Sequence, residues 1–319
     1  MSIKPLNFNA LKTIPLAKRK TDHDEADFCA PFNAGASFSD FLCSLPNLGT
    51  SADLFELRDA IVNAHRRGRR VIVGCGGHVI ASGLSPLLIR LLEKRIISGI
   101  ALTGAAMLQD VEVALTGHTV HTGNKELASG HFCVTEETGR LINEAVNFGV
   151  IENWGFGESI GKKLNDSEPE HIDHSILATA TRYGIPITVH PAIGADAFNL
   201  HPSAHGESLG AAGMHDARLL AAVVAEASGG VLLNVASGVV IPRVFVQAVD
   251  AARNLGKKVE KLTTAMIDSD AADSAVADIV KRLSQSGGRG IWLPGPEELL
   301  LPFLFAAVTD ALRDDDATR

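Results

Sequence analysis

Small and polar residues recur at the points where the sequence predicts the ends of buried strands. Residues 76–78 follow an apolar run at 71–73, and residues 103–105 follow a second run at 100–102. Glycine at such a turn lets backbone N–H groups approach a ligand closely, and the helix that follows attracts a phosphate. The pattern predicts a dinucleotide or another phosphate-bearing ligand, with ordinary tight turns as the alternative. No GxGxxG motif is present, so a typical Rossmann dehydrogenase is not indicated.

Acidic and nucleophilic side chains stand at the same strand ends. Asp268 and Asp270 could hold a cationic amine, or they could cap the helix that follows. Cys75 could form a thiolate near a helix N-terminus, although a small buried residue is the simpler interpretation. No GxSxG elbow directly follows an expected strand, so a serine nucleophile of the hydrolase type is not indicated.

Several of the 12 histidines stand in pairs, which raises the question of a metal site. His201 and His205 are four residues apart, a spacing at which two helical histidines can share a metal ion. Pro202 and Gly206 favour a loop at this point, and no HExxH motif accompanies the pair. We therefore expect no metal and prefer hydrogen-bonded histidines that line a polar site. The other pairs are His118 with His121 and His171 with His174.

Helical patterns alternate with short apolar runs along most of the chain. Continuous apolar strands separated by helices are typical of a parallel sheet covered on both faces. The sequence therefore predicts a doubly wound, mainly parallel α/β sheet in one domain at 28–319, after a polar arm at 1–27. Ligands bind such sheets beyond the carboxyl ends of the strands. The expected strands are 71–73, 100–102, 186–190, 231–235, 259–264 and 291–293, and the expected helices include 172–183, 214–228, 242–255, 271–286 and 297–312.

Composition and charge narrow the class of protein. The net charge is −8, whereas broad nucleic-acid binding requires clustered Lys and Arg. No run reaches the ~18 apolar residues that a membrane helix needs. The four cysteines form no CxxC pair. We expect a cytoplasmic protein with reduced cysteines that binds neither nucleic acid nor membranes.

Six segments, in order along the chain, resemble the deoxyhypusine synthases. Residues 76–83, "GGHVIASG", resemble the turn that begins the NAD site of that family, and residues 100–110 resemble its next NAD-contacting strand and turn. Residues 181–201, which contain "YGIPITVHPAIGADAFNLH", are similar to the segment that holds a family aspartate and an active-site histidine, matched by Asp196 and His201. Residues 231–253, 262–270 and 295–307 resemble the glycine-rich strand and helix, the turn with substrate acids, and the final helix.

The resemblance implies an NAD-dependent enzyme that assembles as a homotetramer with sites at subunit interfaces. Together with the strand-end turns, it gives the expected cofactor-binding residues Gly76, Gly77, His78, Ser82, Thr103, Gly104, Ala105, Gly194, Asp196, Ser237, Gly238, Thr264, Ala265, Pro296 and Glu297. The expected catalytic residues are His201, Asp196 and Asp268, and the expected substrate-binding residues are Asp268, Asp270 and His205.

The sequence departs from that family at two points. The family forms an imine on an enzyme lysine, and the resemblance places Ile241 at that position, where no Schiff base can form. The family's acidic pair after the first NAD turn corresponds to Gln109 and Asp110. Residues 102–119 are also similar to the NAD-binding domain of archaeal-type ornithine cyclodeaminases and arginine dihydrolases, whose chemistry needs a hydride acceptor and a base but no lysine imine.

The preferred hypothesis is an NAD-dependent enzyme that acts at a C–N bond of a small amine, polyamine or amino acid. One alternative is a nucleotide-binding sensor or scaffold without turnover, because a fold does not fix a function. Another is a metal-assisted hydrolase that uses the histidines. A true deoxyhypusine synthase is a further alternative, which the isoleucine at 241 disfavours.

Overall fold

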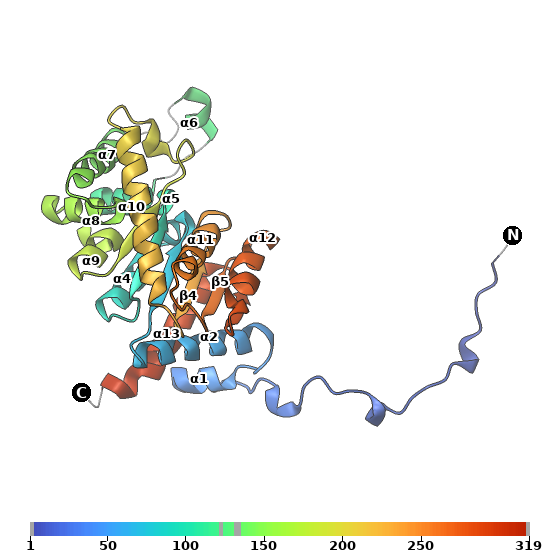
Figure 1. Ribbon diagram of the computed structural model, residues 1–319. Coiled ribbons are helices and arrows are strands. Elements are labelled where there is room, and N and C mark those ends of the chain that lie inside the picture. The colour runs from blue at the N-terminus through green and yellow to red at the C-terminus, as the bar shows by residue number, and fades with distance from the viewer. Residues whose placement is uncertain (1–2, 121–123, 131–134, 317–319) are drawn as a thin grey trace.

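Six parallel strands form one sheet in the computed structural model, which describes residues 3–120, 124–130 and 135–316 (Figure 1). The strand order is β3-β2-β1-β4-β5-β6, and every neighbouring pair is parallel. This confirms the expected α/β class. The strands are β1 (Val71–Cys75), β2 (Gly99–Thr103), β3 (Ile187–His190), β4 (Val231–Val235), β5 (Thr263–Ile267) and β6 (Arg289–Leu293). The helices are α1 (Phe38–Ser44), α2 (Gly49–Arg66), α3 (Gly77–Ala81), α4 (Ser85–Glu93), α5 (Gly104–Thr116), α6 (Asn124–Ser129), α7 (Glu136–Ile151), α8 (Phe156–Ser167), α9 (Ile176–Arg182), α10 (Gly206–Ala225), α11 (Val240–Asn254), α12 (Asp273–Val276) and α13 (Glu297–Asp316).

The sheet separates two apolar cores because side chains alternate between its faces. Val71, Val73 and Cys75 face a core shared with α2, α4, α5 and α13. Ile72 and Ala101 face a second core shared with α10, α11 and α12. The chain leaves β1 and β4 toward opposite edges of the sheet, so a crevice is expected where these neighbouring strands end.

Three elements differ clearly from those expected. The fifth strand was expected at 259–264 but occupies Thr263–Ile267, because pairing with β4 aligns Val231 with Thr263. Val259 and Leu262 are buried without belonging to the strand. Their apolar side chains explain why the sequence predicted the strand too early. α10 begins at Gly206 instead of 214, since its glycine-rich first turns weaken the sequence signal. The expected helix at 271–286 is α12 followed by a π-helical turn and a 3-10 turn.

Two buried aspartates fasten the helices between β2 and β3 to the rest of the fold. Asp110 accepts hydrogen bonds from Ser175 Oγ at 2.6 Å and from the backbone N–H of Ile176 at 2.8 Å, so it caps α9. Asp216 accepts from the backbone N–H groups of Gly157 at 3.1 Å and Val189 at 2.7 Å, which ties α10 to α8 and β3. Asp110, one of the two residues at the family's acidic pair, therefore has a structural role.

The first residues form an exposed arm that leads away from the sheet (Figure 1). Residues 3–26 are exposed throughout, and the first buried side chain is Leu42 in α1. Phe41 of α1 packs edge-on against Phe303 of α13, with ring centroids 6.0 Å apart. Among the described residues, no helix is both long and apolar enough to span a membrane.

Candidate functional site

The turns after β1 and β4 meet at the crevice between these strands. The backbone N–H of Gly76 donates to the carbonyl of Val235 at 3.0 Å. A Cβ atom on Gly76 would lie 1.7 Å from the carbonyl oxygen of Ala236, so only glycine fits there. Gly238, by contrast, has nothing within 4 Å of its Cβ position. The two turns therefore pack closely against each other, and together they form the floor of an open space at Gly238.

The turns after β2 and β3 extend this floor and add a carboxylate. The Cβ position of Gly77 lies 3.3 Å from Cβ of Ala105. A Cβ on Gly104 would lie 2.0 Å from Oδ2 of Asp196, so the carboxylate rests on the first turn of α5. The same oxygen accepts from the backbone N–H of Ala192 at 2.6 Å. Burial raises the pKa of Asp196, and the hydrogen bond from Ala192 partly offsets this effect.

The turn after β6 reaches the β1 turn, and the turn after β5 begins beside the turn after β4, where the backbone N–H of Ala236 donates to the carbonyl of Ile267 at 3.0 Å. His78 Nδ1 lies 3.7 Å from Oε1 of the buried Glu297, at the start of α13 behind Pro296. Asp268 Oδ1 accepts from the backbone N–H of Asp270 at 2.9 Å, which stabilises the turn after β5. No hydrogen bond or ion pair joins these two aspartates to the other turns among the described residues.

Thr264 and Ala265 lie inside β5 and not in the turn where they were expected to bind the cofactor. Both are buried, and Thr264 Oγ1 donates to the carbonyl of Ile279 at 2.7 Å. The cause is the displaced strand boundary, because the strand runs on to Ile267. Their side chains therefore pack in the protein interior, which argues against their expected role at the turn.

His201 is buried and held between two partners. Its Nδ1 lies 2.7 Å from Ser203 Oγ and accepts from the backbone N–H of Ser203 at 3.2 Å. Because Nδ1 accepts that N–H, the ring proton lies on Nε2, which faces Glu136 Oε2 at 3.3 Å. Glu136 is an acidic residue in the first turn of α7. Nothing local in the sequence pairs it with a histidine 65 residues away.

The remaining expected site residues serve the turns themselves. Ser237 Oγ accepts from the backbone N–H of Ile241 at 3.3 Å and so caps α11. Gly194 takes a positive φ of 85°, which the loop after β3 requires. Ser82 ends α3 through a backbone hydrogen bond to His78 at 2.8 Å. His205 is exposed and precedes the first residue of α10. Thr103 Oγ1 accepts from the backbone N–H of Ala106 at 3.1 Å and caps α5.

Cys75 is not placed to act as a nucleophile. Its side chain is buried at the end of β1, and burial raises the pKa of its thiol to about 12. The thiol stays protonated at neutral pH, which favours the interpretation of Cys75 as a small buried residue. In the described part of the chain, no three His, Cys, Asp or Glu side chains converge to hold a metal. His121 and Cys133 lie outside the described residues.

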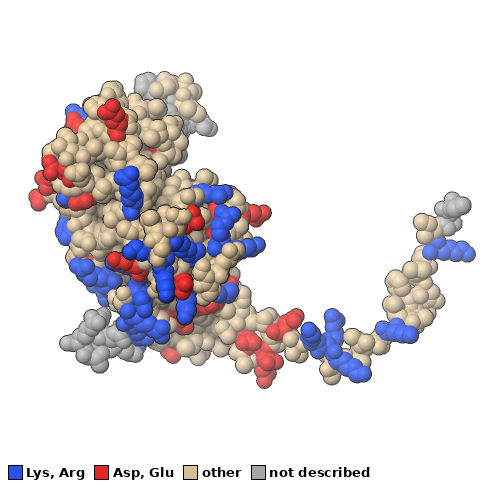
Figure 2. Space-filling model, in the orientation of Figure 1, with Lys and Arg blue, Asp and Glu red and all other residues tan. Residues whose placement is uncertain are grey.

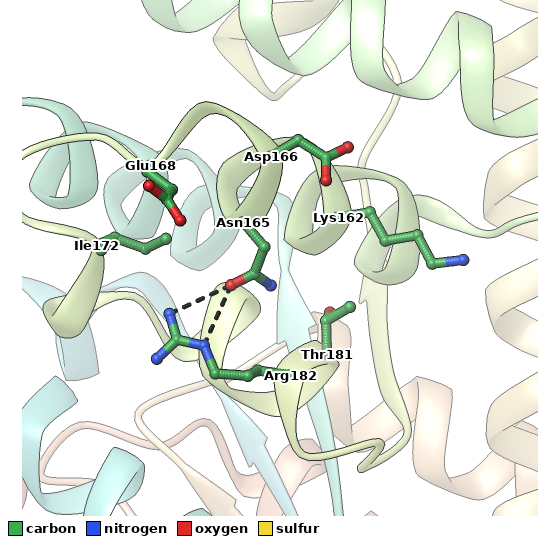
Figure 3. Close-up of a pocket in the computed structure, with 7 residues that line it drawn as sticks. All are labelled: Lys162, Asn165, Asp166, Glu168, Ile172, Thr181 and Arg182. Carbon is green, nitrogen blue, oxygen red and sulfur yellow. Dashed lines mark hydrogen bonds between the residues drawn. The ribbon is translucent and has the colours of Figure 1, made fainter.

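A polar cavity of about 550 Å³ lies elsewhere, between α8 and α9 (Figure 3). Arg182 donates from Nε and Nη2 to Asn165 Oδ1 at 3.3 and 3.2 Å, and Asn165 Nδ2 donates to the carbonyl of Ala178 at 2.9 Å. Arg182 ends α9 shortly before β3 begins, so the cavity lies toward the amino ends of the strands. Its polar groups hold the two helices together, and the cavity is separate from the strand-end turns.

Glu112 is a buried acid of α5 that sequence reasoning did not identify. Burial raises the pKa of Glu112 from 4.5 to about 7. The free energy of unfolding therefore keeps its full value with respect to Glu112 below pH 4.5. It falls as the pH rises through 7, because the folded protein then has to hold the ionised carboxylate. Glu112→Gln, which does not titrate, is expected to be more stable than the wild type by about 1–2 kcal/mol near pH 8 and equally stable near pH 4. Urea unfolding at both pH values measures this difference.

The control for that measurement is Glu144→Gln, which removes an exposed glutamate of α7. We expect this variant to follow the wild type at both pH values. A Glu112→Gln stability that falls between the two pH values as steeply as that of the wild type would contradict the assignment of Glu112 as a buried acid.

Comparisons with known proteins give a match by structure and none by sequence. No family model and no curated protein matches the chain. AgrE, solved with ornithine and NAD+, superposes with a TM-score of 0.55 at 15% identity over 83% of this chain, which spans only 34% of AgrE. A protein assigned as LOR/SDH from Methanococcus maripaludis S2 gives 0.52 at 14% identity, covering 88% of this chain and 72% of that one. A protein assigned as deoxyhypusine synthase from Entamoeba histolytica gives 0.53 at 13% identity, covering 88% and 96%.

The chain has the fold of these proteins. At such low identity the likeness concerns the arrangement of strands and helices and does not extend to side chains. The site is therefore defined by the contacts of this chain alone, through Gly76, Gly77, Gly104, Asp196 and His201.

Proposed function

We propose that the chain is an NAD-dependent enzyme that acts at a C–N bond of a small amine or amino acid. The observation that carries the proposal is the contact between strand-end turns at the point where the strand order reverses. Gly76 meets Ala236, and Gly104 meets Asp196. Crevices at this point of a doubly wound sheet are where dinucleotides bind.

The residues present fit NAD at two places. Gly77 and Gly238 are partly exposed, beside the buried Gly76, and leave backbone accessible where a pyrophosphate would lie. Asp196 comes from the loop after β3 and lies against Gly104 at the end of β2, where an acid in such folds accepts hydrogen bonds from a ribose. A carboxylate there repels the additional phosphate of NADP, so we propose a preference for NAD over NADP.

His201 and the acids after β5 would serve the substrate. NAD supplies the hydride acceptor. His201 donates its Nε2 proton to Glu136 while its Nδ1 accepts from Ser203, so His201 would position the exposed Glu136 carboxylate, which would accept a proton from a substrate ammonium. Asp268, Asp270 and His205 would bind the charged end of the substrate. The proposal requires no lysine imine, in keeping with Ile241.

The comparisons support the substrate class without defining it. AgrE was solved as a ternary complex with ornithine and NAD+, that is, with a small amino acid and the proposed cofactor. The proposal also includes assembly as a homotetramer with sites between subunits, and a cytoplasmic location. A sedimentation experiment tests the assembly.

Mixing the protein with NAD and a panel of ornithine, arginine and spermidine tests the function. We expect reduced nicotinamide to form with at least one of them, and NADP to bind at least tenfold more weakly than NAD. His201→Ala should lose turnover and keep NAD binding, because His201 contacts no glycine-bearing turn of the proposed cofactor floor. The control is His174→Ala, which removes an exposed histidine outside the site and should leave turnover unchanged.

Two outcomes would count against the proposal. NAD that raises the melting temperature without any turnover would favour the sensor alternative. A protein that does not bind NAD at all would leave the strand-end turns without the proposed ligand.

A further inference from the structure

A second cavity, the α10–α11 groove, lies between these two helices and borders the second core, since Leu220, Ala248 and Ala252 belong to both. It has a volume of about 600 Å³. Most of its lining is alanine and other apolar side chains, among them Met214, Ala221, Ala251 and Leu255. Met214 and Leu255 are 54% and 76% exposed, so the groove presents apolar surface to solvent. Apolar cavities of this size with a few polar groups are typical small-molecule sites.

The charge of the groove opposes that of the whole protein. Arg218, Arg243 and Lys257 line it, and no Asp or Glu does, although the chain has a net charge of −8. Arg243 Nε pairs with Asp278 Oδ2 at 3.2 Å. Arg218 and Lys257 form no ion pair among the described residues. Lys and Arg side chains gather over α10 and α11 on the visible face of the molecule (Figure 2). The groove therefore attracts an anion.

The length and shape of the groove favour a slender ligand. Along α11 it extends from Arg243 to Leu255, which corresponds to about 18 Å of helix. A volume of about 600 Å³ is in the range of small-molecule sites. A hydrocarbon chain fits between the alanines, and its head group would meet a cation at the end of the groove. His190 closes the groove near the strand ends and stays neutral there, because burial lowers its pKa to about 4.

We infer that the α10–α11 groove binds a long-chain carboxylate, with its apolar chain on the alanine-lined floor and its carboxylate at Arg218. The inference is independent of the proposed function, since none of the residues that line the groove was assigned to the cofactor or the substrate. It rests on the volume, the apolar lining and the unpaired cations.

Displacement of a fluorescent fatty acid by dodecanoate, below its micelle concentration, tests the inference on the full-length protein. We expect saturable binding to the wild type and at least tenfold weaker binding of dodecanol, which lacks the charge. Arg218→Glu should weaken dodecanoate binding at least tenfold, and Ala221→Trp, which fills the floor, should abolish it. Arg90→Glu makes the same charge change on α4, on the other face of the sheet, and should leave binding unchanged.

Melting temperatures of the variants separate binding from misfolding, since Arg218 is exposed and its replacement should leave the fold intact. The absence of saturable binding would overturn the inference. So would binding that Arg218→Glu and Ala221→Trp leave unchanged. If Ala221→Trp instead converts an oligomer into monomers while the wild type binds no fatty acid, the groove belongs to an interface between copies, and the inference is wrong.

Discussion

Ile241→Lys is expected to lower the free energy of unfolding by about 3–5 kcal/mol and to form no imine with spermidine. Ile241 is fully buried in the second core, and a Cβ on Gly74 would lie 2.3 Å from its Cγ2. A lysine here must bury its charge or lose its proton, and its amine would point under β1 instead of into the crevice. Urea unfolding measures the stability. Borohydride treatment after incubation with NAD and spermidine detects an imine.

The matched control places the same residue on the surface. Val239→Lys introduces a lysine two positions earlier, at a site that is 74% exposed, and should change stability little. Ile241→Val keeps the core apolar and should cost about 1 kcal/mol. A borohydride-trapped spermidine adduct on the Ile241→Lys variant, or a stability of that variant equal to the wild type, would show that the side chain at 241 faces the crevice.

Gly76→Ala is expected to destabilise the protein by about 3 kcal/mol or more and to weaken NAD binding in the protein that remains folded. The new Cβ would meet the carbonyl oxygen of Ala236 at 1.7 Å, and this atom belongs to the backbone, so no rotamer change can relieve the overlap. The turns after β1 and β4 would have to separate at the point where the cofactor is proposed to bind. Thermal unfolding with and without NAD measures both effects.

Gly210→Ala is the control for this variant. Gly210 lies in α10 with nothing within 4 Å of its Cβ position, so alanine should stabilise the helix by up to about 1 kcal/mol. Equal stabilities of the Gly76→Ala and Gly210→Ala variants would contradict the close approach of the two turns. If the Gly76→Ala protein is destabilised but binds NAD as tightly as the wild type, the contact between the two turns is not part of the cofactor site.

Most elements could be predicted from the sequence because their signals are local. Apolar runs predicted strands near 71–73, 100–102, 186–190 and 231–235, and parallel pairing followed from the helices between them. The fifth strand was misplaced because Val259 and Leu262 are buried outside the sheet, and a burial pattern cannot tell a strand from a buried loop. The same error placed Thr264 and Ala265 in a turn.

The site was predictable only in part, for the same reason. The glycine-bearing turns were recognisable as ligand-side features, and Gly76, Gly77, Gly104 and Asp196 do lie in contacting turns. The partner of His201 was not recognisable, because Glu136 comes from α7 and reaches the histidine only after the helices pack.

The sequence by itself determined the α/β class, the glycine turns at the strand ends and the exclusion of a lysine at position 241. These properties depend on residue type and on spacing within a few residues. Only the tertiary structure decided that Gly76 meets Ala236, that Asp110 caps α9 and that α10 and α11 leave a cationic groove between them. Those features join segments that are tens to more than a hundred residues apart, and the strand order that brings them together arises from packing across the whole sheet.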